Sequence, residues 1–99
     1  MQPTYNAAKF PLGLIVVTTG AYDALTPLDM KRGIFFHSQG DWGEVSDDDK
    51  ALNDDALENG TRLLSAYNDE RFPKNGIATI WIITEADRSA TTILFPDEY

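Results

Sequence analysis

The sequence contains no cysteine. This absence excludes disulfide bonds, thiolate nucleophiles and zinc or iron–sulfur sites built on Cys ligands. No apolar run approaches the roughly 18 residues of a transmembrane helix, and Met1-Gln2-Pro3-Thr4 lacks the basic start and apolar stretch of a secretory signal. We therefore expect a soluble, cytoplasmic protein with no membrane partner.

Basic residues are scarce as well. Eight Lys and Arg accompany sixteen Asp and Glu, which gives a formal net charge of −8. Direct binding to nucleic acid depends on Lys and Arg, so we expect no direct nucleic-acid partner. The acidity is local, because residues 41–70 carry ten acidic and two basic residues whereas the rest of the chain carries six of each.

Motifs of known catalytic and cofactor sites are missing too. The seven glycines show neither dinucleotide-binding nor P-loop spacing, and no Gly-x-Ser-x-Gly elbow occurs. The segment 47–52 lacks the alternating acids, central Gly and terminal Glu of a calcium-binding EF-hand loop. We therefore expect no metal and no cofactor.

What the chain does contain is enough apolar material for one core. Its 99 residues are 42% hydrophobic, which predicts one domain over residues 1–99 with residues 1–9 as a loose lead-in. Strands are predicted over residues 12–18, 61–67, 77–84 and 90–95, with a turn over 68–76. The first strand is apolar at consecutive positions, so we expect it to lie in the interior of the sheet.

Three helices are predicted between the first strand and the second. A short helix covers residues 21–25, and Thr26-Pro27-Leu28-Asp29 begins a second one over 27–38. Gly33 and the run Ile34-Phe35-Phe36 leave a strand open as an alternative for this segment. Ser46 and Asn59-Gly60 supply the start and stop of a third helix.

The resulting order β-α-α-α-β-β-β predicts an α+β fold. We expect a four-stranded, mostly antiparallel sheet with helices packed on one side. The predicted core consists of Ile15, Val17, Leu63, Ile80, Ile82, Ile93 and Leu94, with Trp42, Leu52 and Phe35 from the helical layer.

The helix over residues 46–59 is the first candidate site. At 100° per residue, five carboxylates share an arc of about 120° on this helix; they are Asp47, Asp48, Asp54, Asp55 and Glu58. Carboxylates in its second half oppose the helix dipole, so helix stability does not account for them. A solvated helix face with capping acids in its first turn remains the alternative.

A second candidate site lies between the last two strands. Glu85, Asp87 and Arg88 are placed in that connection, and they could form a site with His37, the one histidine. The alternative is a charged hairpin turn in which Asp87 binds its own backbone, with His37 a packed residue.

Four segments of the sequence stand out together: Lys9-Phe10-Pro11-Leu12-Gly13, Gly40-Asp41-Trp42-Gly43, Leu63-Leu64-Ser65-Ala66-Tyr67 and Trp81-Ile82-Ile83-Thr84-Glu85-Ala86-Asp87-Arg88-Ser89-Ala90-Thr91-Thr92-Ile93-Leu94. In these segments, which span nearly the whole chain, the sequence resembles a family of small, uncharacterised bacterial proteins found on chromosomes, plasmids and phages. Some members are labelled plasmid-related, or as a restriction-modification subunit. The resemblance implies a mobile-element setting and no catalytic residues.

These observations predict a small acidic protein-binding module, such as a mobile-element accessory protein or inhibitor. Its helix 46–59 would meet a basic surface of a nucleic-acid-binding protein, with carboxylates standing where phosphates would be. The alternative is a small enzyme or ribonuclease-type toxin that uses the loop at 85–88. Clustering of those residues and His37 in one cleft would favour the enzyme, whereas an exposed acidic face away from any pocket would favour binding.

Overall fold

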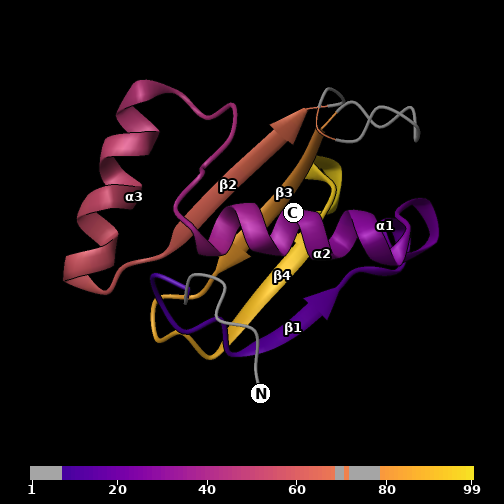
Figure 1. Ribbon diagram of the computed structural model, residues 1–99, viewed down its shortest axis with the longest axis horizontal. Coiled ribbons are helices and arrows are strands. Elements are labelled where there is room, and N and C mark those ends of the chain that lie inside the picture. The colour runs from indigo at the N-terminus through magenta and orange to yellow at the C-terminus, as the bar shows by residue number, and fades with distance from the viewer. Residues whose placement is uncertain (1–7, 69–70, 72–78) are drawn as a thin grey trace, which may run out of the picture.

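The computed structural model describes residues 8–68, 71 and 79–99, and it has the expected α+β architecture (Figure 1). The elements in chain order are β1 (Leu14–Val17), α1 (Thr19–Ala24), α2 (Pro27–Ser38), α3 (Asp47–Asn59), β2 (Leu63–Asn68), β3 (Thr79–Thr84), β4 (Ala90–Leu94) and a 3₁₀ helix, η1 (Pro96–Glu98). The predicted order of one strand, three helices and three strands is confirmed. Most of the predicted lead-in, most of the turn at 68–76 and the first two residues of the strand at 77–84 lie outside the described residues.

The four strands form one mixed sheet in the order β1-β4-β3-β2. The pairs β2–β3 and β3–β4 are antiparallel, and β1 lies parallel to β4. Helix α2 crosses one face of the sheet, and α3 stands beside β2, at the edge opposite from β1 (Figure 1). The acidic helix and the first strand are therefore separated by the full width of the sheet.

Local capping signals explain why the helices begin and end where they do. The Thr26 hydroxyl accepts a hydrogen bond from the Asp29 N–H, and the Asp29 carboxylate accepts one from the Thr26 N–H, each at 3.1 Å. This capping box, with Pro27 in the first turn, decides for helix over strand in segment 27–38. In α3, Ser46 accepts from the Asp49 N–H at 3.1 Å, and Gly60 ends the helix with φ 69°.

The prediction that the first strand lies inside the sheet was wrong, because β1 is an edge strand. Leu14 is 70% exposed, Ile15 43% and Val16 38%. The strands β2, β3 and β4 pair in chain order. The first strand could therefore join the sheet only at the free side of β2 or at the free side of β4. The margin along β2 is occupied by α3 and by the loop before it, which left β1 the outer side of β4.

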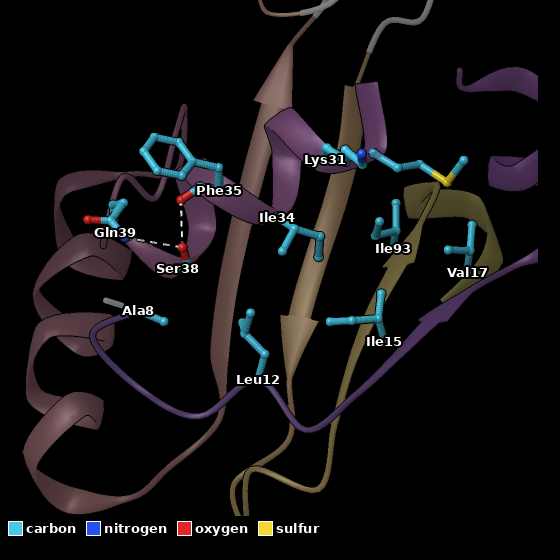
Figure 2. Close-up of a pocket in the computed structure, with 11 residues that line it drawn as sticks. Ala8, Leu12, Ile15, Val17, Lys31, Ile34, Phe35, Ser38, Gln39 and Ile93 are labelled. Carbon is cyan, nitrogen blue, oxygen red and sulfur yellow. Dashed lines mark hydrogen bonds between the residues drawn. The ribbon is translucent and has the colours of Figure 1, made fainter. Parts of the chain in front are cut away.

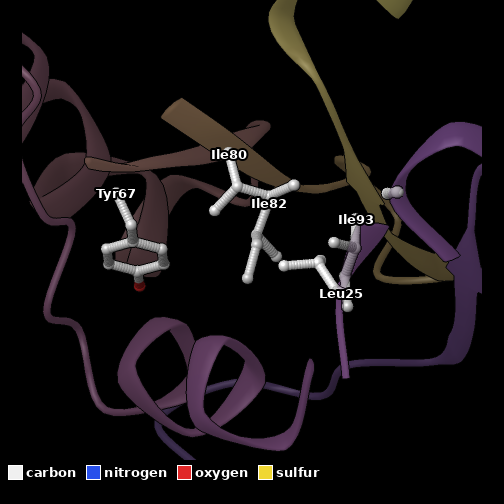
Figure 3. Packing of buried hydrophobic residues seen from close by; sticks show 6 residues of the cluster. Leu25, Tyr67, Ile80, Ile82 and Ile93 are labelled. Carbon is white, nitrogen blue, oxygen red and sulfur yellow. The ribbon is translucent and has the colours of Figure 1, made fainter. Parts of the chain in front are cut away.

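Two clusters of buried side chains hold the layers together. The larger lies between the sheet and helices α1 and α2, and it includes Leu25, Tyr67, Ile80, Ile82 and Ile93 (Figure 3). The smaller lies where α3 meets β2, and it consists of Phe10, Trp42, Ala56 and Leu63.

Most of the predicted core is confirmed. Six of its members are buried, namely Trp42, Leu63, Ile80, Ile82, Ile93 and Leu94, and Val17 is half-buried. Three members were wrong: Ile15 lies on the edge strand, Phe35 is 47% exposed on α2, and Leu52 is 65% exposed on α3. Tyr67, which the prediction did not include, is completely buried and its hydroxyl donates to the Asp41 carbonyl at 2.6 Å.

The loop around Trp42 depends on a glycine. Gly43 has φ 76° and forms a bridge to Ala66 of β2. A Cβ at this position would lie 2.1 Å from the Ala66 carbonyl oxygen, so no larger residue fits without moving the loop. The close approach lets the loop hydrogen-bond with the outer side of β2.

Candidate functional site

Helix α3 is fixed to the margin of the sheet by an amide side chain. The Asn53 amide donates to the Leu64 carbonyl at 2.7 Å and accepts from the Leu64 N–H at 3.1 Å. Asn53 and Ala56 are buried, and Leu57 is half-buried. These residues define the inward face of α3 and leave the rest of the helix in solvent.

Leu52, predicted to point inward, lies on the outward face of α3. The helix turns Asn53 toward β2 because the Asn amide matches the exposed N–H and C=O of Leu64, an interaction that Leu52 could not make. Leu52 follows Asp48 by four residues and precedes Asp55 by three, so the three side chains are neighbours on the helix surface. The outward face therefore combines a large apolar side chain with carboxylates.

The five predicted carboxylates of α3 divide into two kinds. Asp47, Asp48, Asp55 and Glu58 are exposed, and among the described residues no ion pair involves any of them. Asp54 is exposed as well, but its Oδ1 accepts from the Trp42 indole N–H at 3.0 Å. Asp54 thus stabilises the fold, and the other four are free to meet a partner.

The two acids of the preceding loop share one guanidinium. Arg71 donates to both carboxylate oxygens of Asp41, at 2.8 and 3.1 Å, and its Nε lies 3.4 Å from the Glu44 carboxylate. The hydrogen bond from Arg71 lowers the pKa of Asp41 below its ordinary value. Its guanidinium also packs over the rings of Phe36 and Tyr67. Among the described residues of segment 41–70, the acids without an ion pair therefore all lie on α3.

The loop between β3 and β4 uses its charged residues to hold its own backbone. The Asp87 carboxylate accepts from the Ser89 N–H at 3.0 Å, as the hairpin-turn alternative predicted. Arg88 has φ 61° and donates to the Ala56 carbonyl at 2.9 Å and to the Thr61 carbonyl at 2.7 Å. Arg88 therefore caps the C-terminal end of α3, and Glu85 lies 3.9 Å from Arg62.

His37 is completely buried in a chain of hydrogen bonds. Its Nδ1 lies 2.6 Å from the Ser65 hydroxyl and its Nε2 2.8 Å from the Thr84 hydroxyl. The Thr84 hydroxyl lies 2.7 Å from that of Thr91, which donates to the Leu12 carbonyl at 2.7 Å.

A carbonyl can only accept, so the direction of each bond between Leu12 and His37 Nε2 is fixed. Thr91 donates to Leu12 and accepts from Thr84, and Thr84 in turn accepts from His37 Nε2–H. Nε2 therefore carries a proton. In the neutral ring, Nδ1 accepts from Ser65.

Burial, aided by the positive charge of Arg88, lowers the pKa of His37 from 6.5 to about 3. Both ring nitrogens are used by internal hydroxyls, and no ring atom is accessible to a substrate. Phe10 packs edge-on against the imidazole at 5.2 Å and also lies below the Arg88 guanidinium. The four residues of the second candidate site thus do not line a common cleft.

An apolar groove of about 720 Å³ between β1 and α2 had no counterpart in the sequence analysis (Figure 2). Ile15 and Val17 form its wall on the strand, and Met30, Ile34 and Phe35 form its wall on the helix. The sequence feature that marks this groove is the apolar run of β1. That run predicted a strand buried inside the sheet, but it forms a sheet edge beside the groove.

Within the part of the chain that the structure describes, no group of three or more His, Asp and Glu side chains is placed to hold a metal ion. No helix among these residues has the length and apolar character needed to cross a bilayer. Comparisons with protein-family models, curated proteins and solved structures gave no match. The geometry of the molecule is therefore the basis for a functional assignment.

Proposed function

We propose that this protein is a binding module that presents the outward face of α3 to a protein with a basic surface. The observation that carries the proposal is the exposed Leu52, at 65%, between the unpaired carboxylates of Asp48 and Asp55. A single exposed apolar side chain is common on protein surfaces. On α3, however, carboxylates flank this side chain on both sides along the helix. Protein interfaces commonly place an apolar contact inside a charged rim.

The carboxylates of this face are not explained by the stability of α3. Asp55 and Glu58 lie in the C-terminal half of the helix, where negative charge opposes the dipole, and the last turn contains no basic residue. The anchoring of α3 is performed by other groups, namely Asn53, Asp54 and Arg88. The exposed acids are therefore available for a role outside the fold.

The chemistry of the face defines the partner. Asp48 and Asp55 are seven residues apart, or roughly 10 Å along the helix axis. Lys or Arg side chains at a similar separation, around an apolar recess for Leu52, would complement it. Surfaces that bind nucleic acid carry such basic residues, so a nucleic-acid-binding protein of a mobile element or its host is the proposed partner class.

The enzyme alternative is not favoured by any observation at the residues it named. His37 is enclosed, Arg88 is bonded to backbone carbonyls, and Asp87 is bonded to its own turn. A general acid or base must reach a substrate atom within hydrogen-bond distance, and His37 has no exposed atom to do so.

The test is capture of partners from the native cell with matched baits. The parent chain is compared with Asp48→Asn/Asp55→Asn and with Leu52→Ala. The control Asp23→Asn/Asp97→Asn changes the net charge equally at exposed acids away from α3, and Leu28→Ala removes a leucine 55% exposed on α2. We expect at least one protein with a basic surface to be retained by the parent and both controls and lost from both α3 variants. Equal recovery of every captured protein by all five baits would contradict the proposal.

A further inference from the structure

Among the residues that the structure describes, the margin of β1 is an open sheet edge with unused backbone groups. The Leu14 N–H donates to the Ser89 carbonyl at 3.0 Å and the Thr18 N–H to the Ile93 carbonyl at 3.1 Å. Backbone groups alternate sides along a strand, so the N–H and C=O groups of Ile15 and Val17 point away from β4. The edge therefore offers two donors and two acceptors to another strand.

The other margin of the sheet is closed. The Ala66 N–H of β2 donates to the Trp42 carbonyl at 3.1 Å, and the Ala66 carbonyl accepts from the Glu44 N–H at 2.6 Å. Asn53 satisfies both backbone groups of Leu64 in the same way. Within the described part of the chain, the backbone groups of β2 at its outer edge are hydrogen-bonded, whereas those of Ile15 and Val17 in β1 are not.

Nothing in the sequence of β1 discourages pairing. Proteins usually protect an open edge with Lys, Pro or a bulge, and β1 is Leu-Ile-Val-Val in regular register with β4. Three of its four side chains are exposed, from 70% at Leu14 to 38% at Val16, and Val17 is half-buried. An edge with these properties is a template for strand addition.

The apolar groove lies beside this same edge. Ile15 and Val17 point from β1 toward α2, as Figure 2 shows. A strand added next to β1 would place alternate side chains on the same face as Ile15 and Val17, next to the groove and the half-exposed Phe35. Backbone hydrogen bonds and an apolar recess for alternate side chains are the two elements of recognition by strand addition.

We propose that the strand which occupies this edge is β1 of a second copy of the chain, paired antiparallel about a two-fold axis at Val16. In this register Val16 lies opposite Val16 of the second copy as a non-hydrogen-bonded pair. Ile15 lies opposite Val17 of the second copy, and these two pairs use all the open backbone groups of both strands. The result is a continuous eight-stranded sheet.

The distribution of charge favours a second copy. A net charge of −8 on each chain would oppose self-association if it were spread evenly. It is concentrated in residues 41–70, however, and α3 lies at the opposite margin of the sheet from β1 (Figure 1). Pairing through β1 joins two uncharged strands and puts the acidic helices at the far ends of the combined sheet. This inference does not depend on the proposed function, and it leaves both α3 faces exposed.

Cross-linking through an introduced cysteine tests the proposed register, because the chain has none of its own. In Val16→Cys the two Cα atoms would lie about 4.5 Å apart across the two-fold axis, within the range for a disulfide. In the matched variant Leu14→Cys they would be separated by four residue steps, or roughly 13 Å. We expect Val16→Cys to form a disulfide dimer under mild oxidation at least about tenfold faster than Leu14→Cys.

Random collision predicts the opposite order, because Leu14 is the more exposed of the two positions. Equal rates, or a faster reaction of Leu14→Cys, would overturn the proposal.

Sedimentation equilibrium of the parent chain is the second measurement, with an expected rise of the apparent mass toward twice the monomer mass of 11.0 kDa as concentration increases. Val16→Lys places like charges opposite each other in the proposed dimer, so this variant should remain monomeric, with an unchanged circular dichroism spectrum. The control Tyr22→Lys, at a site 65% exposed on α1, should dimerise like the parent. A parent that stays monomeric at every concentration would also overturn the proposal.

Discussion

Replacing His37 by Gln should remove a specific part of the acid sensitivity of the fold. His37 has a pKa of about 3 in the folded protein and about 6.5 when unfolded. Below pH 6.5 the unfolded chain takes up a proton that the folded chain does not bind. The free energy of unfolding therefore falls as the pH drops from 6.5 toward 3, and this contribution is fully present above 6.5.

The size of the effect follows from the linkage relation. One proton corresponds to about 1.36 kcal/mol for each pH unit, so between pH 7 and pH 5 His37 should cost the parent about 2 kcal/mol. His37→Gln keeps a donor for Thr84 and has no proton to gain. It leaves the Ser65 hydroxyl without its acceptor, and we expect the variant to be less stable at pH 7 by about 1–3 kcal/mol.

The assay is urea unfolding of both chains at half-unit steps from pH 7.5 to 4.5. Carboxylates titrate alike in both proteins, so their contribution cancels in the difference between the free energies of unfolding of the parent and of His37→Gln. This difference should be constant above pH 6.5 and smaller by about 2 kcal/mol at pH 5. Because the chain has one histidine, its imidazole C–H signals in an NMR spectrum need no further assignment and should not move above pH 4.5. A constant stability difference down to pH 5, or an imidazole that titrates near pH 6.5, would refute the buried neutral His37.

Three further predictions concern contacts inside the fold. Ile82→Ala should lower the free energy of unfolding by about 2–5 kcal/mol, measured by urea denaturation, and a loss below about 1 kcal/mol would mean that β3 is not central. Gly43→Ala should cost about 1–3 kcal/mol because its Cβ would meet the Ala66 carbonyl at a positive φ, and an unchanged denaturation midpoint would contradict that close approach. Asp54→Ala should lower the free energy of unfolding by about 1 kcal/mol and alter the tryptophan fluorescence, because it removes the acceptor of the Trp42 indole N–H. The control Asp55→Ala should leave the fluorescence unchanged and leave the stability unchanged or slightly raised. Identical behaviour of the two variants would refute the Trp42 hydrogen bond.

The elements that local chemistry determines could be predicted from the sequence. The Thr26–Asp29 capping box and the Ser46 N-cap each act over three residues, and Gly60 acts through its own backbone angle. Helix α2 begins, and helix α3 begins and ends, where these signals predicted. The strand order of the meander follows from chain proximity in the same way. The hairpin role of Asp87 is equally local.

Properties that depend on contacts between distant segments could not be predicted. An apolar run such as β1 has the same pattern in the middle of a sheet and at a bare edge. Leu52 and Asn53 are adjacent, and which of them faces β2 is decided by the free backbone of Leu64, eleven residues away from Asn53. The partners of His37 come from β2 and β3, so its burial and its tautomer were beyond any local signal.

The measurement that tests the account most directly is the association rate of the captured partner with the parent chain and with Asp48→Asn/Asp55→Asn, at low salt and at about 0.5 M salt. A basic partner steered by the carboxylates should bind the variant several-fold more slowly at low salt. The two association rates should converge at high salt, where the Debye length is less than roughly 8 Å and charges farther apart than this are screened from each other. Dissociation should accelerate in Leu52→Ala and not in the Leu28→Ala control. Identical association rates for parent and variant at both salt concentrations would contradict the claim that α3 is the binding face.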